Sequence, residues 1–122
     1  MANVLLIDDD QIILNLLETV LSMKNHTSCT ADNGTDGLQL AQEQIFDLVI
    51  TDLSLPGVTG WQIIEHLKSN PATSGIAIVA LSAHNSASDR DAAYSAGCDA
   101  YIAKPFDSTN LVNTVETVLK AR

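Results

Sequence analysis

The sequence of 122 residues predicts one α/β domain in which a parallel β-sheet lies between two layers of helices. Five short apolar runs alternate with five segments of helical character, and no long linker separates them. Three of the runs, at residues 4–7, 48–50 and 76–81, are continuously apolar, which is typical of parallel strands covered on both faces. Strand and helix alternating over this length favour a three-layer sandwich with right-handed crossovers.

Turn and capping residues delimit the expected elements. The predicted strands are Asn3 to Asp8, Thr27 to Ala31, Leu48 to Thr51, Ile76 to Leu81 and Ala100 to Ala103. Asp10 is the expected N-cap of the first helix, and residues 32–34 and 57–60 each begin another. Residues 70–71 close the helix that starts near Gly60, and Gly97 suits the C-terminal cap before the last strand.

The first and last predicted helices differ in the width of their apolar faces. In the last, Ser108 to Lys120, the apolar residues fall within an arc of roughly 120°, as expected for one face against a core. In the first, Gln11 to Lys24, they spread over roughly 200°, more than one sheet face needs. Two explanations are open: a helix wedged between neighbours, or a partly exposed face that docks a partner helix.

The composition limits the classes of function. The 15 acidic and 6 basic residues give a formal net charge of −9, which disfavours direct binding to nucleic acid or to an anionic membrane surface. No signal peptide and no run of roughly 20 apolar residues occurs, so a cytoplasmic protein is expected. Cys29 and Cys98 are predicted to be buried free thiols, and His26 and His66 to be surface residues.

Polar residues of a consistent kind follow the predicted strands. The first strand ends in Asp8-Asp9-Asp10 and the third in Asp52, while Ser82 and Lys104 follow the fourth and fifth. Ligand sites of open parallel sheets form beyond these carboxyl ends. If the first and third strands are neighbours, Asp8, Asp9 and Asp52 converge and repel one another unless a proton or metal intervenes. Oxygen ligands with room for water favour Mg²⁺ over zinc.

The chain resembles, over essentially its whole length, the receiver domains of bacterial two-component response regulators. The matching segments are VLLIDDD at 4–10, DLVITDLSLPG at 47–57 with Gly60, IVALSA at 78–83, and AGCDAYIAKPF at 96–106. The resemblance implies a flavodoxin-like (βα)5 fold with strand order 2-1-3-4-5. It also implies that residues 1–122 are one receiver domain of the chemotaxis-regulator kind, without an output domain.

The resemblance implies a role for each pocket residue. Asp52 would be the phosphoacceptor, taking a phosphoryl group from a phosphohistidine. Asp9, Asp52 and the backbone carbonyl of Ser54 would hold Mg²⁺, for which Mn²⁺ would substitute, and Asp8 would act largely through a metal-bound water. Lys104 would pair with a phosphoryl oxygen.

Further positions in the family pattern concern switching. Pro105 resembles the family's cis-proline, which aims the preceding lysine into the site. Ser82 would donate a hydrogen bond to the phosphoryl group, and Tyr101 would be the switch aromatic that turns inward when Ser82 moves. His84, near the pocket mouth, would tune the lifetime of the phosphate.

These expectations describe a regulatory switch that promotes its own phosphorylation and dephosphorylation. Its partners would be a histidine kinase or histidine phosphotransfer protein and a downstream protein target, with no nucleic acid and no membrane. A receiver domain excised from a hybrid histidine kinase or a larger regulator has the same sequence features. Other hypotheses are a haloacid-dehalogenase-like phosphatase using Asp8, a flavin-binding module, and a degenerate receiver that is not phosphorylated.

Overall fold

The computed structural model describes residues 1–83 and 86–121, in which strands and helices alternate. The strands are β1 (Asn3–Ile7), β2 (Thr27–Ala31), β3 (Leu48–Asp52), β4 (Ala77–Ser82) and β5 (Ala100–Ala103). The helices are α1 (Gln11–Met23), α2 (Gly34–Glu43), α3 (Gly60–Ser69), α4 (Ala87–Ala96) and α5 (Ser108–Lys120). Among these described helices, none is both long enough and apolar enough to cross a membrane.

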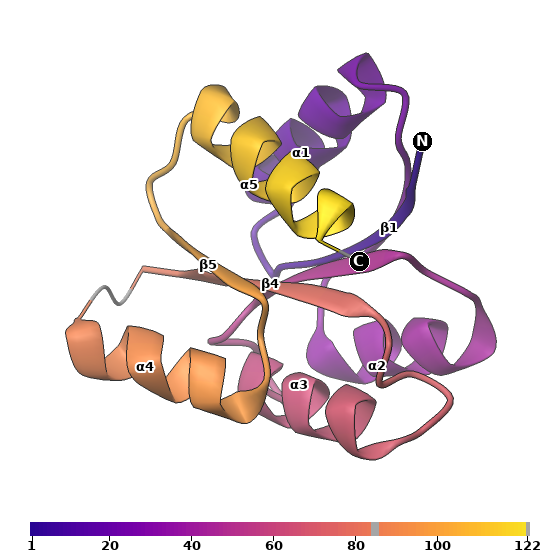
Figure 1. The fold of residues 1–122 in the computed structure, drawn as a ribbon, viewed down its shortest axis with the longest axis vertical. Helices are drawn as coiled ribbons and strands as arrows, with labels where there is room; N and C mark the ends of the chain where they lie inside the picture. Colours follow the sequence, from indigo (N-terminus) through magenta and orange to yellow (C-terminus); the bar gives the residue numbers. More distant parts are fainter. Residues whose placement is uncertain (84–85, 122) are drawn as a thin grey trace.

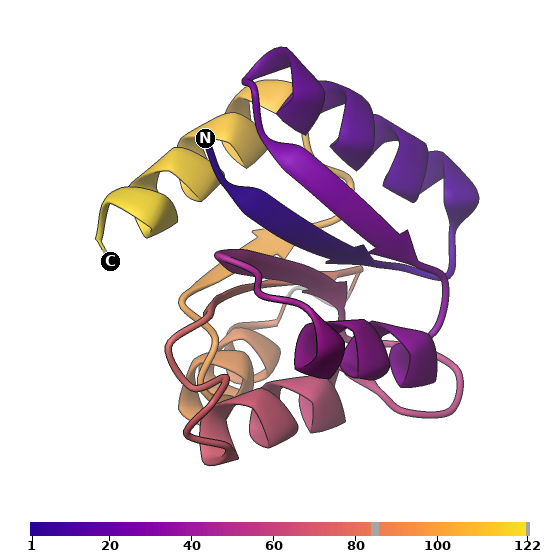
Figure 2. The same ribbon diagram turned by 90° about the vertical axis from the view of Figure 1, so that its right-hand side faces the viewer.

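The strands form one parallel sheet in the order β2-β1-β3-β4-β5, which confirms the expected topology (Figure 1). Sequence order reverses between β1 and β3, where the chain leaves one half of the sheet for the other. Since all strands are parallel, their carboxyl ends meet at one edge, toward which the arrowheads of β1 and β2 point in Figure 2. Strand order therefore puts the ends of β1 and β3 side by side.

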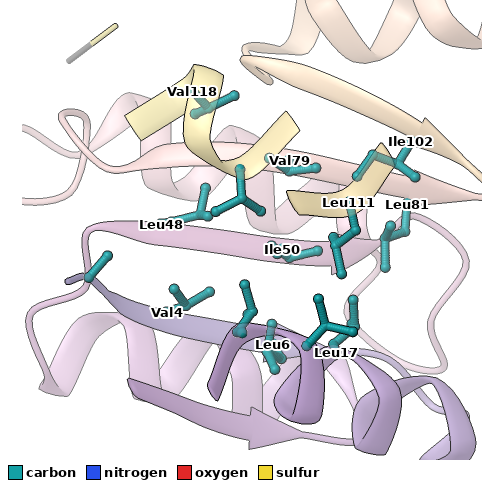
Figure 3. Close-up of a cluster of buried hydrophobic side chains, with 14 of the residues drawn as sticks. Val4, Leu6, Leu17, Leu48, Ile50, Val79, Leu81, Ile102, Leu111 and Val118 are labelled. Atoms are coloured by element: carbon teal, nitrogen blue, oxygen red, sulfur yellow. The ribbon is translucent and has the colours of Figure 1, made fainter. Parts of the chain in front are cut away.

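Helices cover both faces of the sheet, α1 and α5 on one and α2, α3 and α4 on the other (Figure 1). Side chains alternate between these faces along each strand. In β1, Leu6 packs with Leu17 of α1 on the first face, whereas Leu5 and Ile7 belong to the cluster on the second (Figure 3). Both faces of the central strands are buried, which explains why the runs at 4–7, 48–50 and 76–81 are continuously apolar rather than alternating.

Helix α1 presents an apolar face wider than the core it covers. Four of its apolar residues are buried against the sheet and α5: Leu14, Leu17, Val20 and Leu21. Ile12 is 76% exposed and Leu16 is 41% exposed. The broad arc is thus a core face extended by an exposed apolar edge, and docking of a partner helix on that edge stays a prediction.

The capping residues act as the sequence predicts, and strand ends differ by one residue. The Asp10 side chain accepts a hydrogen bond from the N–H of Ile12, and Gly97 caps α4 with φ of 121°, a left-handed value that favours glycine. Strand β4 runs one residue further than expected because Ser82 pairs with Ala103, and β3 includes Asp52 through its pairing with Leu81.

Two predictions about side-chain exposure were wrong. His26 is buried rather than on the surface, because both ring nitrogens find partners there: the Ala2 N–H donates to Nδ1, and Nε2 lies 3.2 Å from Glu116 Oε1. Cys29 is only half-buried, because it lies on β2, which has a single neighbouring strand. Cys98 is a buried free thiol, and His66 is exposed, as predicted.

Candidate functional site

The acidic pocket forms where the carboxyl ends of β1 and β3 meet. Asp8 follows β1 directly, Asp52 is the last residue of β3, and the two strands are neighbours in the sheet. Carboxylate oxygens of Asp8, Asp9 and Asp52 all lie within 4.8 Å of one another. Asp8 and Asp52 are buried, with exposures of 0% and 7%, whereas Asp9 is exposed at the rim. The convergence expected from the strand ends is present.

Lys104 bridges the two buried carboxyl groups. Its Nζ atom donates to Asp8 Oδ2 at 2.7 Å and to Asp52 Oδ2 at 2.9 Å. The other oxygens accept from the main chain, Asp8 Oδ1 from the Asp10 N–H at 2.9 Å and Asp52 Oδ1 from the Ser54 N–H at 3.0 Å. Every oxygen of the two buried carboxyl groups therefore has a donor, and the side chains are held in one arrangement.

The electrostatics of the pocket follow from this sharing. Burial raises the pKa of Asp8, and its hydrogen bond to Lys104 only partly offsets that effect. Burial by itself lowers the pKa of the Lys104 amine, but hydrogen bonds to Asp8 and Asp52 outweigh it and raise the pKa. Lys104 is therefore a cation at neutral pH. One ammonium group faces two buried carboxyl groups, and a third acid stands at the rim.

The donor set suits a small hard cation. All three side chains offer carboxylate oxygens, which Mg²⁺ prefers in proteins. One carboxylate oxygen from each of Asp8, Asp9 and Asp52 lies within 4.8 Å of the other two, so the three could face one small cation. The exposed position of Asp9 leaves water access at the rim. The residues present thus fit a magnesium site.

Ser82, Ser54 and the Lys104–Pro105 peptide bond lie at the same end of the sheet. Ser82 ends β4 and is 2% exposed, and the Lys104–Pro105 peptide bond is cis. Ser54 contacts Asp52 through its N–H, and coordination by its carbonyl stays a prediction. Half-buried Tyr101 lies on β5 among the residues that pack against α2, α3 and α4. His84 lies outside the described residues.

Comparison with known proteins decides the class of the chain. Residues 4–116 match the family model described as the response regulator receiver domain. The chain belongs to this family. It is a receiver domain of two-component response regulators, as the sequence motifs predicted, and the phosphatase hypothesis is not favoured.

Individual relatives agree with this assignment. The receiver domain is 34% identical over 120 residues to the transcriptional regulatory protein AfsQ1 of Streptomyces coelicolor, which covers 98% of this chain and 52% of that protein. A putative response regulator from Chloroflexus aurantiacus has a TM-score of 0.93 at 32% identity, covering 99% of this chain and 98% of that one. The chain spans about half the length of the curated relatives it matches.

A second solved structure carries a metal. The receiver domain of the sensor histidine kinase PA1611 from Pseudomonas aeruginosa has a TM-score of 0.89 and covers 98% of both chains, with a magnesium ion coordinated in its active-site cleft. It is 23% identical to this receiver domain, so the likeness concerns the fold.

Two contacts near the site were not predicted from the sequence. The guanidinium carbon of Arg90, on α4, lies 5.3 Å from the ring centroid of Tyr101, within the range of a cation–π interaction. The buried hydroxyl of Thr51 donates to the carbonyl of Asp52. An arginine on a polar helix is too common to be singled out. A threonine between the apolar run at 48–50 and Asp52 is a signal that could have identified Thr51.

Proposed function

We propose that Asp52 is the phosphoacceptor of this receiver domain and takes its phosphoryl group from a phosphohistidine. The observation that carries the proposal is the bridge of Lys104 between the buried carboxyl groups of Asp8 and Asp52, at the edge where the parallel strands end. A lysine held there places a positive charge beside the oxygen that would attack phosphorus.

The transfer would proceed as a displacement at phosphorus. An Asp52 carboxylate oxygen forms the new bond while the P–N bond of the phosphohistidine breaks, and the electron pair returns to the imidazole nitrogen. The Lys104 ammonium group would stabilise the negative charge that develops on one phosphoryl oxygen. The Ser82 hydroxyl would donate a hydrogen bond to a second phosphoryl oxygen. A bound Mg²⁺ or Mn²⁺, held by Asp8, Asp9, Asp52 and the Ser54 carbonyl, would neutralise charge on the transferring group.

The same site would control a surface formed by α4, β5 and α5. Movement of Ser82 toward the phosphoryl group would let Tyr101 turn inward and remodel that surface, which is the two-state response of such switches. His84 would tune the lifetime of the phosphate. In this scheme the domain promotes its own phosphorylation and dephosphorylation and is a regulator rather than a metabolic enzyme.

Receiver domains as a class interact with histidine kinases and downstream targets. For this chain we propose a histidine kinase or histidine phosphotransfer protein as donor and a protein as target, in the cytoplasm. The net charge of −9 argues against direct contact with nucleic acid or an anionic membrane. Residues 1–122 would act as one receiver domain, whether alone or within a hybrid histidine kinase or larger regulator.

The test is incubation of the 122-residue protein with acetyl phosphate and Mg²⁺, followed by intact mass measurement. The wild type is expected to gain one phosphoryl group, and Asp52→Asn to gain none. Asp91→Asn, which changes an exposed acid of α4, is the matched control and should react like the wild type. An unmodified wild type, or equal modification of Asp52→Asn, contradicts the proposal, and phosphate mapped to Asp8 supports the phosphatase hypothesis instead.

A further inference from the structure

We propose that Thr51 is a positioning residue for phosphoryl transfer, acting through the main chain of Asp52. This inference rests on the proposed function, because it concerns the orientation of the same Asp52 carboxylate. Among the described residues, the Thr51 hydroxyl makes no hydrogen bond to a pocket carboxylate. The hydroxyl instead donates to the carbonyl oxygen of Asp52 at a distance of 3.0 Å.

Thr51 is a polar residue that follows the three apolar residues of β3 and precedes Asp52. It has an exposure of 0% and follows Leu48, Val49 and Ile50, which are equally buried. Because side chains alternate along a strand, Thr51 points to the same face as Val49, the face covered by α2, α3 and α4. A hydroxyl there loses its contacts with water and needs a partner within the protein. The Asp52 carbonyl supplies that partner.

Gly60 forms the other wall around this carbonyl. A Cβ atom at Gly60 would overlap the Asp52 carbonyl oxygen and would lie 2.6 Å from the Leu53 Cα atom. The Gly60 N–H also donates to the Leu53 carbonyl at 3.1 Å. The first turn of α3 therefore lies directly against the Asp52 peptide, and the Thr51 hydroxyl holds that peptide from the strand side.

The Asp52 carbonyl lies near the end of β3, where the hydrogen bond from Thr51 adds to the contacts that hold the peptide. The pairing of β1 with β3 ends at Ile7 and Thr51, so on the β1 side Asp52 lies one residue beyond the last partner. On the β4 side, Asp52 pairs with Leu81, and the N–H of the Asp52–Leu53 peptide donates to the Leu81 carbonyl at 3.0 Å. Rotation of the Asp52 peptide would swing its Cα–Cβ bond and carry the carboxylate away from Lys104. A misplacement of about 1 Å can lower a rate by about 100-fold, because the attacking oxygen must be aligned with the breaking bond.

A purely structural role for Thr51 can be separated from a positioning role, because the chain contains a matched threonine. Thr73 is also buried, with 7% exposure, and its hydroxyl donates to the Leu67 carbonyl at 2.8 Å. That bond lies just beyond the end of α3, away from the pocket. The substitution Thr73→Val removes the same kind of bond as Thr51→Val.

The experiment measures the rate of phosphorylation by acetyl phosphate at saturating Mg²⁺ for four proteins: wild type, Thr51→Val, Thr51→Ser and Thr73→Val. Thr51→Val is expected to react about tenfold more slowly, whereas Thr51→Ser and Thr73→Val should stay within about twofold of the wild type. The unfolding temperature of each protein is measured alongside. Both valine variants lose one buried hydroxyl and are expected to unfold at similar temperatures, so a slower rate confined to Thr51→Val would not be an effect of stability.

Equal rates for Thr51→Val and Thr73→Val overturn the inference while leaving the proposed function intact. A wild type that gains no phosphoryl group overturns both. If Thr51→Val does not fold, the wild-type hydroxyl proton of Thr51 is followed by NMR in water. Slow exchange that alters on phosphorylation supports the positioning role, and rapid exchange with solvent contradicts it.

Discussion

At the scale of the residue, the pocket depends on one cation shared by two buried acids. The identities of Asp8, Asp52 and Lys104 are predictable because each follows a recognisable strand. The sequence does not predict that Lys104 contacts both acids, because that depends on the conformation of its long, flexible side chain. Thr51 shows the same limit of sequence-based prediction. The sequence shows that residue 51 has a hydroxyl group, but only the structure shows that this group donates to the Asp52 carbonyl and that α3 packs against the same carbonyl at Gly60.

Cys98 gives a pH prediction that belongs to this scale. Burial raises the pKa of its thiol from 9.0 to about 11, because the thiolate is poorly solvated there. The unfolded chain therefore releases this proton at lower pH than the folded chain. The stabilisation from the neutral thiol is complete below pH 9 and is lost as the pH rises through about 11.

Chemical denaturation at pH 8 and pH 10.5 tests this prediction. The free energy of unfolding should fall more between the two pH values in the wild type than in Cys98→Ala, which lacks the titrating group. Cys29→Ala removes the half-buried thiol of β2 and should behave as the wild type does. If Cys98→Ala shows the same pH dependence as the wild type, other groups cause the loss of stability at high pH.

At the scale of the element, helices α1 and α4 depart most from the pattern of a simple covering helix. Helix α1 carries the exposed apolar pair Ile12 and Leu16, which follows from the wide apolar arc in its sequence. Helix α4 buries only Ala93 among the residues assigned to it, and its Arg90 contacts Tyr101 of β5. The sequence pattern predicts that α4 forms, but it does not predict which contacts hold this weakly apolar helix against the sheet.

His26 links Ala2, the residue before β1, to α5 and supports a prediction at this scale. Its ring accepts a hydrogen bond from the Ala2 N–H through Nδ1, and Nε2 faces Glu116 of α5. Replacing His26 by Phe leaves a buried N–H without an acceptor, so the free energy of unfolding should fall by about 1–3 kcal/mol. Urea denaturation measures the change.

His66 provides the control for that substitution. It is exposed on α3, so His66→Phe should change the free energy of unfolding by no more than about 0.5 kcal/mol. Equal effects at the two positions would mean that the contacts of His26 contribute nothing. The burial of His26 was mispredicted because a single histidine between two elements has no periodicity to reveal the face it occupies.

At the scale of the whole molecule, alternation of strands and helices was enough to predict the layers and the parallel sheet. Strand order came from family resemblance, since the apolar runs alone do not state which strands are neighbours. Once β1 and β3 are adjacent, the pocket follows from the three acids at their ends. The net charge of −9 is thus partly a local property of this pocket.

Metal binding should stabilise the whole fold. A ligand that binds only the folded state adds about 2.7 kcal/mol to the free energy of unfolding at 100 times its dissociation constant. Mg²⁺ is therefore expected to raise the unfolding temperature of the wild type, with NaCl at equal ionic strength as the reference. Asp9→Asn should weaken this response without destabilising the metal-free protein, because Asp9 is exposed.

The exposed Asp91 again serves as the matched acid. Asp91→Asn should keep the full response to Mg²⁺, since it lies on α4 rather than at the ends of β1 and β3. A rise in unfolding temperature that is equal for Mg²⁺ and Na⁺ would indicate general screening of the acidic surface and would argue against a specific site.

The N-terminus and the end of α5 lie on the side of the sheet where β1 begins, whereas the arrowheads of β1 and β2 point the other way (Figure 2). Ala2 is held there by His26, and α5 ends at Lys120 on the same side. A fluorescent protein or a surface anchor attached at either end would therefore not block access to the acidic pocket. The domain is therefore suited to assays on a surface and to fluorescent reporters of Asp52 phosphorylation, because the acidic pocket stays accessible.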